Sequence, residues 1–341
     1  MNSFGRIFRI SIFGESHGES VGIVVDGCPA GMPLTIDDFL PDLERRKGGT
    51  QKGTTPRQEE DLPIFKSGLF NNTTTGAPIT ILFENKNIRS GDYEKQRDVP
   101  RPGHADFVAH KKFAGFEDYR GSGHFSGRLT VALVAAGVIG KKILARFASP
   151  HEERIGVKSS ILEIGGETDL DKGLQKAIDA KDSIGGIIEC RATGLPIGLG
   201  EPFFDSAESL LSHMVFAIPA VRGIEFGTGF AAAKMFGSDH NDAIETLEGK
   251  TRTNHAGGIV GGLTNGNELV FRIAIKPTSS TPKEQTTLNW ETGKVEIASV
   301  KGRHDLCIAL RVPVILEAVT ATVLVDLMML EQRVQRISKI N

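Results

Sequence analysis

Glycine is the feature of this sequence that most limits its possible folds. The chain has 40 glycines among 341 residues, and they follow no fixed period. Their share is well above the ~7% that is usual in proteins, and the lack of a period excludes a collagen-like helix. Scattered glycines allow tight turns and let the backbone approach a ligand closely. We therefore expect a globular fold with many turns and with glycine-rich loops around a ligand.

The charges are nearly balanced overall. Because the formal net charge is −2, no global basic field favours nucleic acid or an anionic membrane, and any anion site must be a local cluster. The three cysteines, Cys28, Cys190 and Cys307, have neither metal-type nor disulfide-type spacing, so we expect buried free thiols in a reducing cytoplasm. No signal peptide is recognised. The most apolar stretch, residues 312–330, contains a proline and two acidic residues, which favours a buried helix over a membrane span.

The pattern of apolar residues predicts both strands and helices. Segments rich in β-branched residues and bounded by turn residues predict strands at 8–13, 22–26, 79–83, 186–190 and 269–275. Apolar residues at helical spacing predict helices at 128–147, 170–180, 205–216 and 317–340, and a shorter one from about Pro41 to the glycines at 48–49. No low-complexity linker divides the chain, so residues 1–341 are expected to form a single domain.

The order of these elements does not follow a Rossmann fold. Strands and helices do not alternate as βαβ units, and no G-x-G-x-x-G follows the first strand. The expected fold class is α/β, or more narrowly α+β, built as a layered sandwich. Residues 22–47 and 186–216 share the succession of strand, Gly/Pro turn and helix, which indicates either a duplicated unit or a chance similarity.

Two short motifs place a histidine beside other polar groups in a turn. Residues 14–18 read Gly-Glu-Ser-His-Gly, and residues 101–106 read Arg-Pro-Gly-His-Ala-Asp. Because imidazole titrates near neutrality, an exposed His17 or His104 could donate a proton. Arg101, His104 and Asp106 could also converge on one anion. The alternative for both motifs is a polar turn whose histidine only bonds to backbone or solvent.

Four further segments suit an anion or a planar ligand. Residues 120–128, Arg-Gly-Ser-Gly-His-Phe-Ser-Gly-Arg, open into a predicted helix whose free N–H groups attract phosphate, although the ending of a P-loop is missing. Residues 254–266 contain two glycine pairs that would let a flat ring lie close. Residues 276–281 place a lysine and hydroxyls at a strand end, and residues 301–305 combine cations, imidazole and carboxylate. A plain helix start, a hairpin bend and polar turns are the respective alternatives.

A local basic cluster completes the candidate groups. It comprises Arg45, Arg46, Lys47, Lys52 and Arg57. A substrate with several acidic groups would need such a cluster, although a run of charges is also typical of a solvated surface. The nine histidines show no H-E-x-x-H motif and no zinc-type pairing with cysteine, so no metal site is expected.

Taken together, these motifs resemble the chorismate synthase family. G-E-S-H-G, R-P-G-H-A-D, N-H-A-G-G-I-x-G-G, K-P-T-S-S and G-R-H-D occur in the family's order, and the match extends from Phe4 to about Val323. The resemblance implies a layered β-α-β sandwich of the family's own type and a homotetramer. It also implies reduced FMN and the trans-1,4 elimination of phosphate from 5-enolpyruvylshikimate 3-phosphate, which gives chorismate with no net redox change, as the last common step of aromatic amino acid biosynthesis. Whether the chain also reduces flavin with NADPH is left open.

The resemblance assigns roles to particular residues. His17 corresponds to the acid near the departing phosphate, His104 to the acid that protonates reduced flavin near N1, and Asp305 to the carboxylate near flavin N5. Ser16 and Ser126 correspond to assisting serines. Substrate contacts are implied for Arg45, Arg46 and Lys52. Flavin contacts are implied for His124, Phe125, Ser126, Pro219, Ala220, Gly261, Lys276, Pro277, Thr278, Ser279, Ser280 and Arg303.

The chain departs from the family's pattern at several of these positions. His124-Phe125-Ser126 stands where Arg-Ser-Ser is usual, and Pro219 stands where asparagine is common. Lys52 replaces an arginine and cannot form the same bidentate fork, and Leu306 follows G-R-H-D where proline is expected. Two other classes remain as alternatives: an FMN-dependent oxidoreductase acting on a phosphorylated acid, and a non-enzymatic anion-binding protein.

Overall fold

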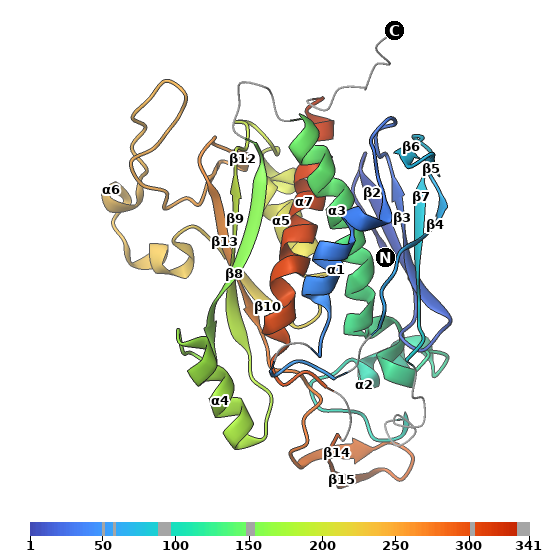
Figure 1. Cartoon of the computed structure of the whole chain (residues 1–341). Coiled ribbons are helices and arrows are strands. Elements are labelled where there is room, and N and C mark those ends of the chain that lie inside the picture. The colour runs from blue at the N-terminus through green and yellow to red at the C-terminus, as the bar shows by residue number, and fades with distance from the viewer. Residues whose placement is uncertain (50–51, 57–58, 88–96, 148–153, 301–303, 333–341) are drawn as a thin grey trace.

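Two antiparallel sheets enclose a layer of helices (Figure 1). The computed structural model describes the chain except residues 50–51, 57–58, 88–96, 148–153, 301–303 and 333–341. The first sheet has the order β1 (Ser3–Phe4), β2 (Arg9–Gly14), β3 (Ser20–Asp26), β7 (Ile79–Glu84) and β4 (Ile64–Ser67). The second has the order β8 (Gly156–Ile164), β9 (Gly186–Thr193), β13 (Leu269–Ile275) and β10 (Val221–Phe226). The predicted β-α-β sandwich is confirmed, and since neighbouring strands in both sheets are antiparallel, it is not a Rossmann fold.

The helical layer consists of α1 (Leu40–Arg46), α3 (Thr130–Phe147), α5 (Ala207–Val215) and α7 (Val312–Leu330). Peripheral helices are α2 (Asp106–Phe113), α4 (Leu170–Ala180) and α6 (Gly237–His240). Three hairpins complete the fold: β5–β6 (Leu69–Phe70, Thr73–Thr74), β11–β12 (Ile259–Val260, Leu263–Thr264) and β14–β15 (Gln285–Asn289, Lys294–Ala298). Short 3₁₀ turns lie at Ile36–Asp38, Arg120–Phe125, Gly127–Leu129, Phe203–Asp205, Gly229–Lys234 and Ile308–Arg311.

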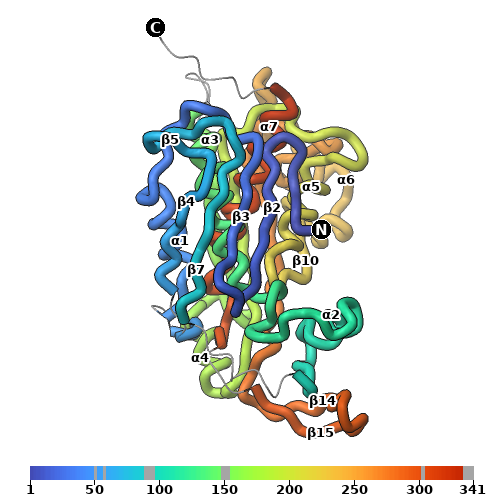
Figure 2. Tube along the Cα trace, turned by 90° about the vertical axis from the view of Figure 1, so that its right-hand side faces the viewer, coloured from blue at the N-terminus to red at the C-terminus, as the bar shows by residue number. Residues whose placement is uncertain are grey.

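The alternation of side chains along the strands explains which sheet faces are buried. On β3, Val21, Ile23 and Val25 are fully buried, and they pair across the ladder with buried Phe83, Ile81 and Ile79 of β7. Successive side chains of a strand point to opposite faces, so this apolar set forms one surface. The helices α3 and α7 cover such surfaces from within the sandwich (Figures 1 and 2).

The two long helices α3 and α7 run side by side in the same direction (Figure 1). They approach closely at Gly137, where an added Cβ would lie 2.2 Å from the Cβ of Ala318. Residues 308–330 are long and apolar enough to cross a membrane, but 78% of their most apolar window is buried inside the protein. This stretch is therefore a core helix, as its interrupting proline and acids predict.

The two halves of the sandwich repeat one arrangement. Strands β2, β3, β7 and β4 lie in the same order as β8, β9, β13 and β10. In each half, a helix (α1 or α5) follows the second strand, a small hairpin (β5–β6 or β11–β12) precedes the third listed strand, and a long helix (α3 or α7) comes later in the chain. The similarity of residues 22–47 and 186–216 therefore reflects a duplicated unit.

Corresponding threonines make the same hydrogen bonds in the two halves. Thr74 Oγ1 donates to the carbonyl of Pro29 at 2.6 Å, and Thr264 Oγ1 donates to that of Pro196 at 2.7 Å. Each threonine carbonyl accepts an N–H two residues after that proline, from Gly31 and from Gly198 respectively, both at 2.8 Å. In each half, the same two hydrogen bonds therefore connect the turn after the second strand (β3 or β9) to the small hairpin.

One predicted helix has the wrong bounds. The helix predicted at 317–340 begins at Val312 and ends at Leu330. Pro313 lies in its first turn, where the missing N–H is harmless, and Gln332 has a positive φ of 55°; residues 333–341 lie outside the described part. The three cysteines are free and buried, as expected, and burial raises the pKa of Cys28 to about 12.

Candidate functional site

A cavity of about 540 Å³ opens where α3 and α7 begin. Its volume is in the range of small-molecule sites. Its walls come from Ile12 and from six stretches far apart in the sequence, within residues 46–61, 101–105, 121–133, 217–222, 276–280 and 304–315. The fold therefore gathers most of the predicted motifs around one space.

The starts of α3 and α7 make this end of the sandwich electropositive. Free N–H groups at a helix N-terminus carry partial positive charge and attract anions. Each of the two helices is also preceded by an arginine that lines the cavity, Arg128 before α3 and Arg311 before α7. An anion is therefore favoured here although the whole chain is slightly acidic.

His104 lies in the cavity wall and is held by two charged neighbours. Its Nδ1 lies 2.5 Å from Oδ1 of Asp106, and Arg101 Nη2 donates to the same oxygen at 2.7 Å. Burial alone would raise the pKa of Asp106, but hydrogen bonds from Arg101 and His104 lower it well below its usual value. The resulting carboxylate fixes the orientation of the imidazole, as expected for a group that transfers protons.

Asp305 also lines the cavity. Its Oδ1 accepts the backbone N–H of Thr55 at 2.9 Å, and its Oδ2 accepts from Arg311 Nη1 at 3.0 Å. The carbonyl of Asp305 accepts from Thr278 Oγ1 at 2.8 Å. The carboxylate is thus oriented by Thr55 and Arg311, and Thr278 holds the backbone of Asp305.

The strand end at β13 supplies a cation and hydroxyls. Lys276 Nζ donates to Ser279 Oγ at 2.8 Å, and Ser280 Oγ accepts from Arg101 Nη1 at 3.0 Å. Burial, with the nearby charge of Arg222, lowers the pKa of Lys276. Lys276, Thr278, Ser279 and Ser280 line the cavity; Pro277 is not among its lining residues.

The remaining residues predicted to contact the cofactor lie partly in the cavity lining and partly outside it. Pro219, Ala220, His124, Phe125 and Ser126 line the cavity. Gly261 instead lies between β11 and β12 with a φ of 63°, away from the lining, and Arg303 is outside the described residues. The hairpin position of Gly261 matches the alternative that the sequence left open for its glycine pairs.

His17 and Ser16 lie behind the wall and not in the lining. They are 5% and 0% exposed, and Ser16 N donates to the carbonyl of Gly123 at 3.1 Å. A Cβ on Gly121, which does line the cavity, would lie 2.0 Å from Nδ1 of His17. The Gly-rich loop thus separates His17 from the cavity by one backbone layer, and Gly121 lacks a side chain where the imidazole packs.

Among the basic residues predicted to contact substrate, only Arg46 lines the cavity within the described chain. Arg45 pairs with Glu317 of α7 at 2.7 Å, and Lys52 donates to Gln175 at 3.1 Å. Arg45 and Arg46 are neighbours on α1, so their side chains point in different directions around the helix.

Four charged residues that line the cavity were not singled out from the sequence: Glu59, Asp61, Arg222 and Arg311. Arg128, which also lines it, was named only as the last residue of the motif 120–128. Arg128 stands at the start of a buried helix, and Arg311 is a lone cation before a strongly apolar stretch, so both offered a signal. Asp61 stands among ordinary acidic residues and offered none. Across the part of the chain that the structure describes, no group of three His, Cys, Asp or Glu side chains could hold a metal.

Comparisons with known proteins point to one family. The family model described as chorismate synthase matches residues 8–329. A chorismate synthase of Chitinophaga pinensis is 69% identical over 339 residues, which cover 99% of this chain and 100% of that protein. One from Dehalococcoides mccartyi strain BAV1 is 41% identical and covers 99% of each chain. A crystal structure of chorismate synthase superposes with a TM-score of 0.70 at 25% identity, over 96% of this chain and 93% of that one.

Proposed function

Because this chain belongs to the chorismate synthase family, the carbon–oxygen lyases of aromatic amino acid biosynthesis, we propose that it eliminates phosphate from 5-enolpyruvylshikimate 3-phosphate with the help of reduced FMN. The product is chorismate, and no net oxidation occurs. The observation that carries this proposal is the single cavity in which His104, Asp305 and Arg46 meet beside the two helix starts. Such a space suits a polyanion next to a planar ring.

The donors around the cavity fit FMN. Lys276 and the hydroxyls of Thr278 and Ser279 suit a phosphate or the polar edge of a flavin. Ala220 has a φ of 72°, and its neighbours 217–219 give an apolar surface for a ring. When bound and reduced, FMN supplies transient electron density to the substrate, and the protein provides placement and charge.

The chain's own acids and bases have separate places. His104 would hold a proton on its imidazole, with Asp106 and Arg101 fixing the ring. Asp305 would lie close to flavin N5, with its side chain oriented by Arg311 and by the backbone N–H of Thr55. For His17 to protonate the departing phosphate, the loop at Gly121 has to move aside when the substrate binds.

Cations provide the remaining stabilisation. Arg46, Arg128 and Arg311 line the cavity, and they would stabilise the charge that grows on the leaving phosphate or bind the carboxylates of the substrate. Donors that are already oriented stabilise developing charge more than mobile ones do. Ser126 Oγ, which accepts from Arg128 N at 3.3 Å, would assist at the same helix start.

An anaerobic assay tests the proposal. Purified protein receives chemically reduced FMN and the enolpyruvyl substrate, and phosphate, chorismate and the flavin spectrum are measured together. Equal amounts of phosphate and chorismate without net flavin oxidation are expected. Stoichiometric flavin oxidation would show an oxidoreductase instead, and oxidised FMN with NADPH would reveal any built-in reductase activity.

The proposal includes a homotetramer of single-domain chains in the cytoplasm. Exposed aromatic and aliphatic side chains on and near the projecting segment 229–251 support self-association: Phe203, Phe204, Phe230, Phe236 and Leu247 are each at least 80% exposed. Exposed apolar groups of this kind mark interaction surfaces. Light scattering coupled to gel filtration would give the mass, and a monomer at micromolar concentration would contradict this part.

A further inference from the structure

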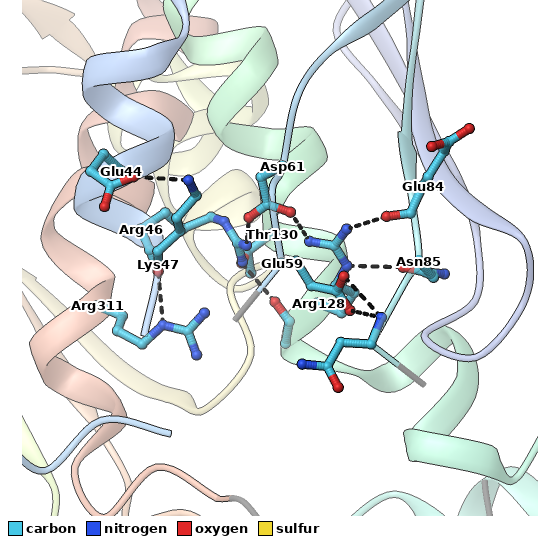
Figure 3. Close-up of polar contacts among 12 residues, drawn as sticks. Glu44, Arg46, Lys47, Glu59, Asp61, Glu84, Asn85, Arg128, Thr130 and Arg311 are labelled. Carbon is cyan, nitrogen blue, oxygen red and sulfur yellow. Dashed lines mark hydrogen bonds and ion pairs between the residues drawn. The ribbon is translucent and has the colours of Figure 1, made fainter. Parts of the chain in front are cut away.

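A buried cluster of three charged side chains forms one wall of the cavity (Figure 3). The side chain of Asp61, ahead of β4, is 1% exposed, and those of Arg46 and Arg128 are 3% and 4% exposed. Asp61 Oδ2 accepts from Arg46 Nη2 at 2.5 Å, and Asp61 Oδ1 accepts from Arg128 Nη1. One carboxylate therefore joins the C-terminal turn of α1 to the start of α3.

Neutral oxygens fix other sides of the same guanidinium groups. Arg46 Nη1 donates to Thr130 Oγ1 at 3.3 Å. Arg128 donates from Nε to Asn85 Oδ1 at 3.0 Å and from Nη2 to the carbonyl of Glu84 at 3.2 Å (Figure 3). A guanidinium is a rigid planar fork, so these bonds leave each group few orientations.

The cluster has unequal charge. Two guanidinium groups share one buried carboxylate, and Glu59, which also lines the cavity, acts electrostatically on Arg128. The cavity lining as a whole holds seven arginines and lysines against three acids, and this excess of positive charge favours a bound anion. Burial alone would raise the pKa of Asp61, but the charges of Arg46 and Arg128 lower it, so the carboxylate is ionised at neutral pH. Without that carboxylate, the two like charges would repel each other.

The backbone of Asp61 is in an unusual conformation. Its φ is +53°, in the left-handed region that few residues other than glycine adopt. Aspartate tolerates this region better than most side chains. Such a conformation persists where the surrounding structure imposes it, and it is frequent at functional sites.

We propose that Asp61 is a positioning residue, which holds the guanidinium groups of Arg46 and Arg128 together on the cavity wall so that both bind the same anionic substrate. The inference rests on the proposed function for the identity of the substrate. The attraction for an anion comes from the positive charge of the cavity lining and does not depend on which substrate binds. Asp61 acts through the two arginines and does not itself bind the anion.

The test compares three variants in steady-state kinetics and in binding of inorganic phosphate, measured by calorimetry. Asp61→Asn keeps the shape but removes the charge, and Asp61→Glu keeps the charge but lengthens the side chain. Asp326→Asn is the matched control: Asp326 is also a buried carboxylate, but its partners among the described residues are the backbone N–H groups of residues 6–8.

We expect Asp61→Asn to raise KM and the Kd of phosphate at least tenfold, and Asp61→Glu to raise them about threefold. Asp326→Asn should lower Tm with KM and Kd within twofold of wild type. Unchanged or tighter phosphate binding in folded Asp61→Asn would overturn the inference. If that variant does not fold, Asp61→Glu decides in the same way, because wild-type phosphate affinity there also overturns it.

The phosphate measurement separates this inference from the proposed function. It needs neither flavin nor turnover. If the wild-type protein forms no chorismate, the proposed function fails, while a loss of phosphate affinity in Asp61→Asn still supports the role of Asp61. If the wild type forms chorismate but the Asp61 variants keep the wild-type KM and Kd of phosphate, the role of Asp61 is refuted while the proposed function stands.

Discussion

Replacing Gly137 by alanine tests whether the close contact of α3 and α7 supports the whole fold. Both helices are central, and both begin at the cavity. An added Cβ at position 137 would lie 2.2 Å from Cβ and 2.3 Å from Cα of Ala318. Carbon atoms in contact are about 3.5–4.0 Å apart, so the helices would have to separate by roughly 1.5 Å.

The expected loss of stability follows from two opposing effects. Forcing an extra methyl group into a packed core costs about 1–3 kcal/mol or more, and so severe an overlap belongs at or above the upper end. Alanine is favoured over glycine within a helix by about 1 kcal/mol. The net loss is therefore about 2 kcal/mol. With an unfolding entropy of about 2.1 cal/mol/K per residue, a chain of 341 residues should lose about 3 °C in Tm.

Thermal and urea unfolding of the Gly137→Ala variant would measure this loss. Gly140→Ala is the control one turn further along α3, because its nearest neighbour, the carbonyl carbon of Ala321, lies 3.3 Å from the added Cβ. We expect the control to lose less stability than Gly137→Ala. A Gly137→Ala protein with the same or a higher Tm than wild type would refute the argument from close packing.

Three other substitutions have expected outcomes. Gly121→Ala should abolish chorismate formation while circular dichroism shows that the fold is retained, because the new Cβ would lie 2.0 Å from Nδ1 of His17 and residue 121 has a φ of 56°. Gly237→Ala is the control, since its added Cβ meets no atom within 4 Å. An active Gly121→Ala enzyme would count against a role for His17. Asp326→Ala should lower the free energy of unfolding in urea by about 3 kcal/mol, because three backbone N–H groups lose a charged acceptor, and a loss below about 1 kcal/mol would contradict this. The pKa of Asp106 is lowered in the folded state, so the ionised side chain stabilises the fold above the unfolded pKa of about 3.9, and this effect is lost as the pH falls towards the folded pKa. Asp106→Asn should therefore be less stable than wild type at pH 7 but lose stability less steeply between pH 5 and pH 3. Parallel curves of unfolding free energy against pH for the two proteins would disprove this linkage.

The sequence predicted those elements whose pattern depends on local burial. The helix Leu170–Ala180 and the strand Leu269–Ile275 have the predicted bounds, because one face or both faces of each are apolar with the right period. The end of α7 was missed because apolar residues continue at helical spacing beyond Leu330, at Val334, Ile337 and Ile340, so the sequence pattern gives no sign of where the helix ends. The apolar period also could not show that α3 and α7 lie side by side. Their close contact joins Gly137 to Ala318, which is 181 positions further along the chain.

The sequence predicted those residues of the candidate site that stand together in short motifs. His104, Asp305 and the hydroxyls after Lys276 stand in compact motifs, and the fold brings them to one cavity. Arg45 is expected to contact the substrate; in the structure its side chain pairs with Glu317 and is not among the cavity's lining residues. Asp61 could not be recognised, because its partners Arg46 and Arg128 are distant in sequence and only the tertiary structure brings their charges together.

The duplicated halves bear on how one orientation of a small ligand is chosen. Each half contributes a helix start that carries an arginine with its own carboxylate, Arg128 with Asp61 and Arg311 with Asp305. The first pair is almost fully buried, and Arg46 shares its carboxylate, whereas the second pair is more exposed, with side chains 18% and 11% exposed. A ligand whose two ends differ therefore meets two different arginine–carboxylate pairs at corresponding positions of the two halves, so one orientation of the ligand is favoured over the reverse orientation.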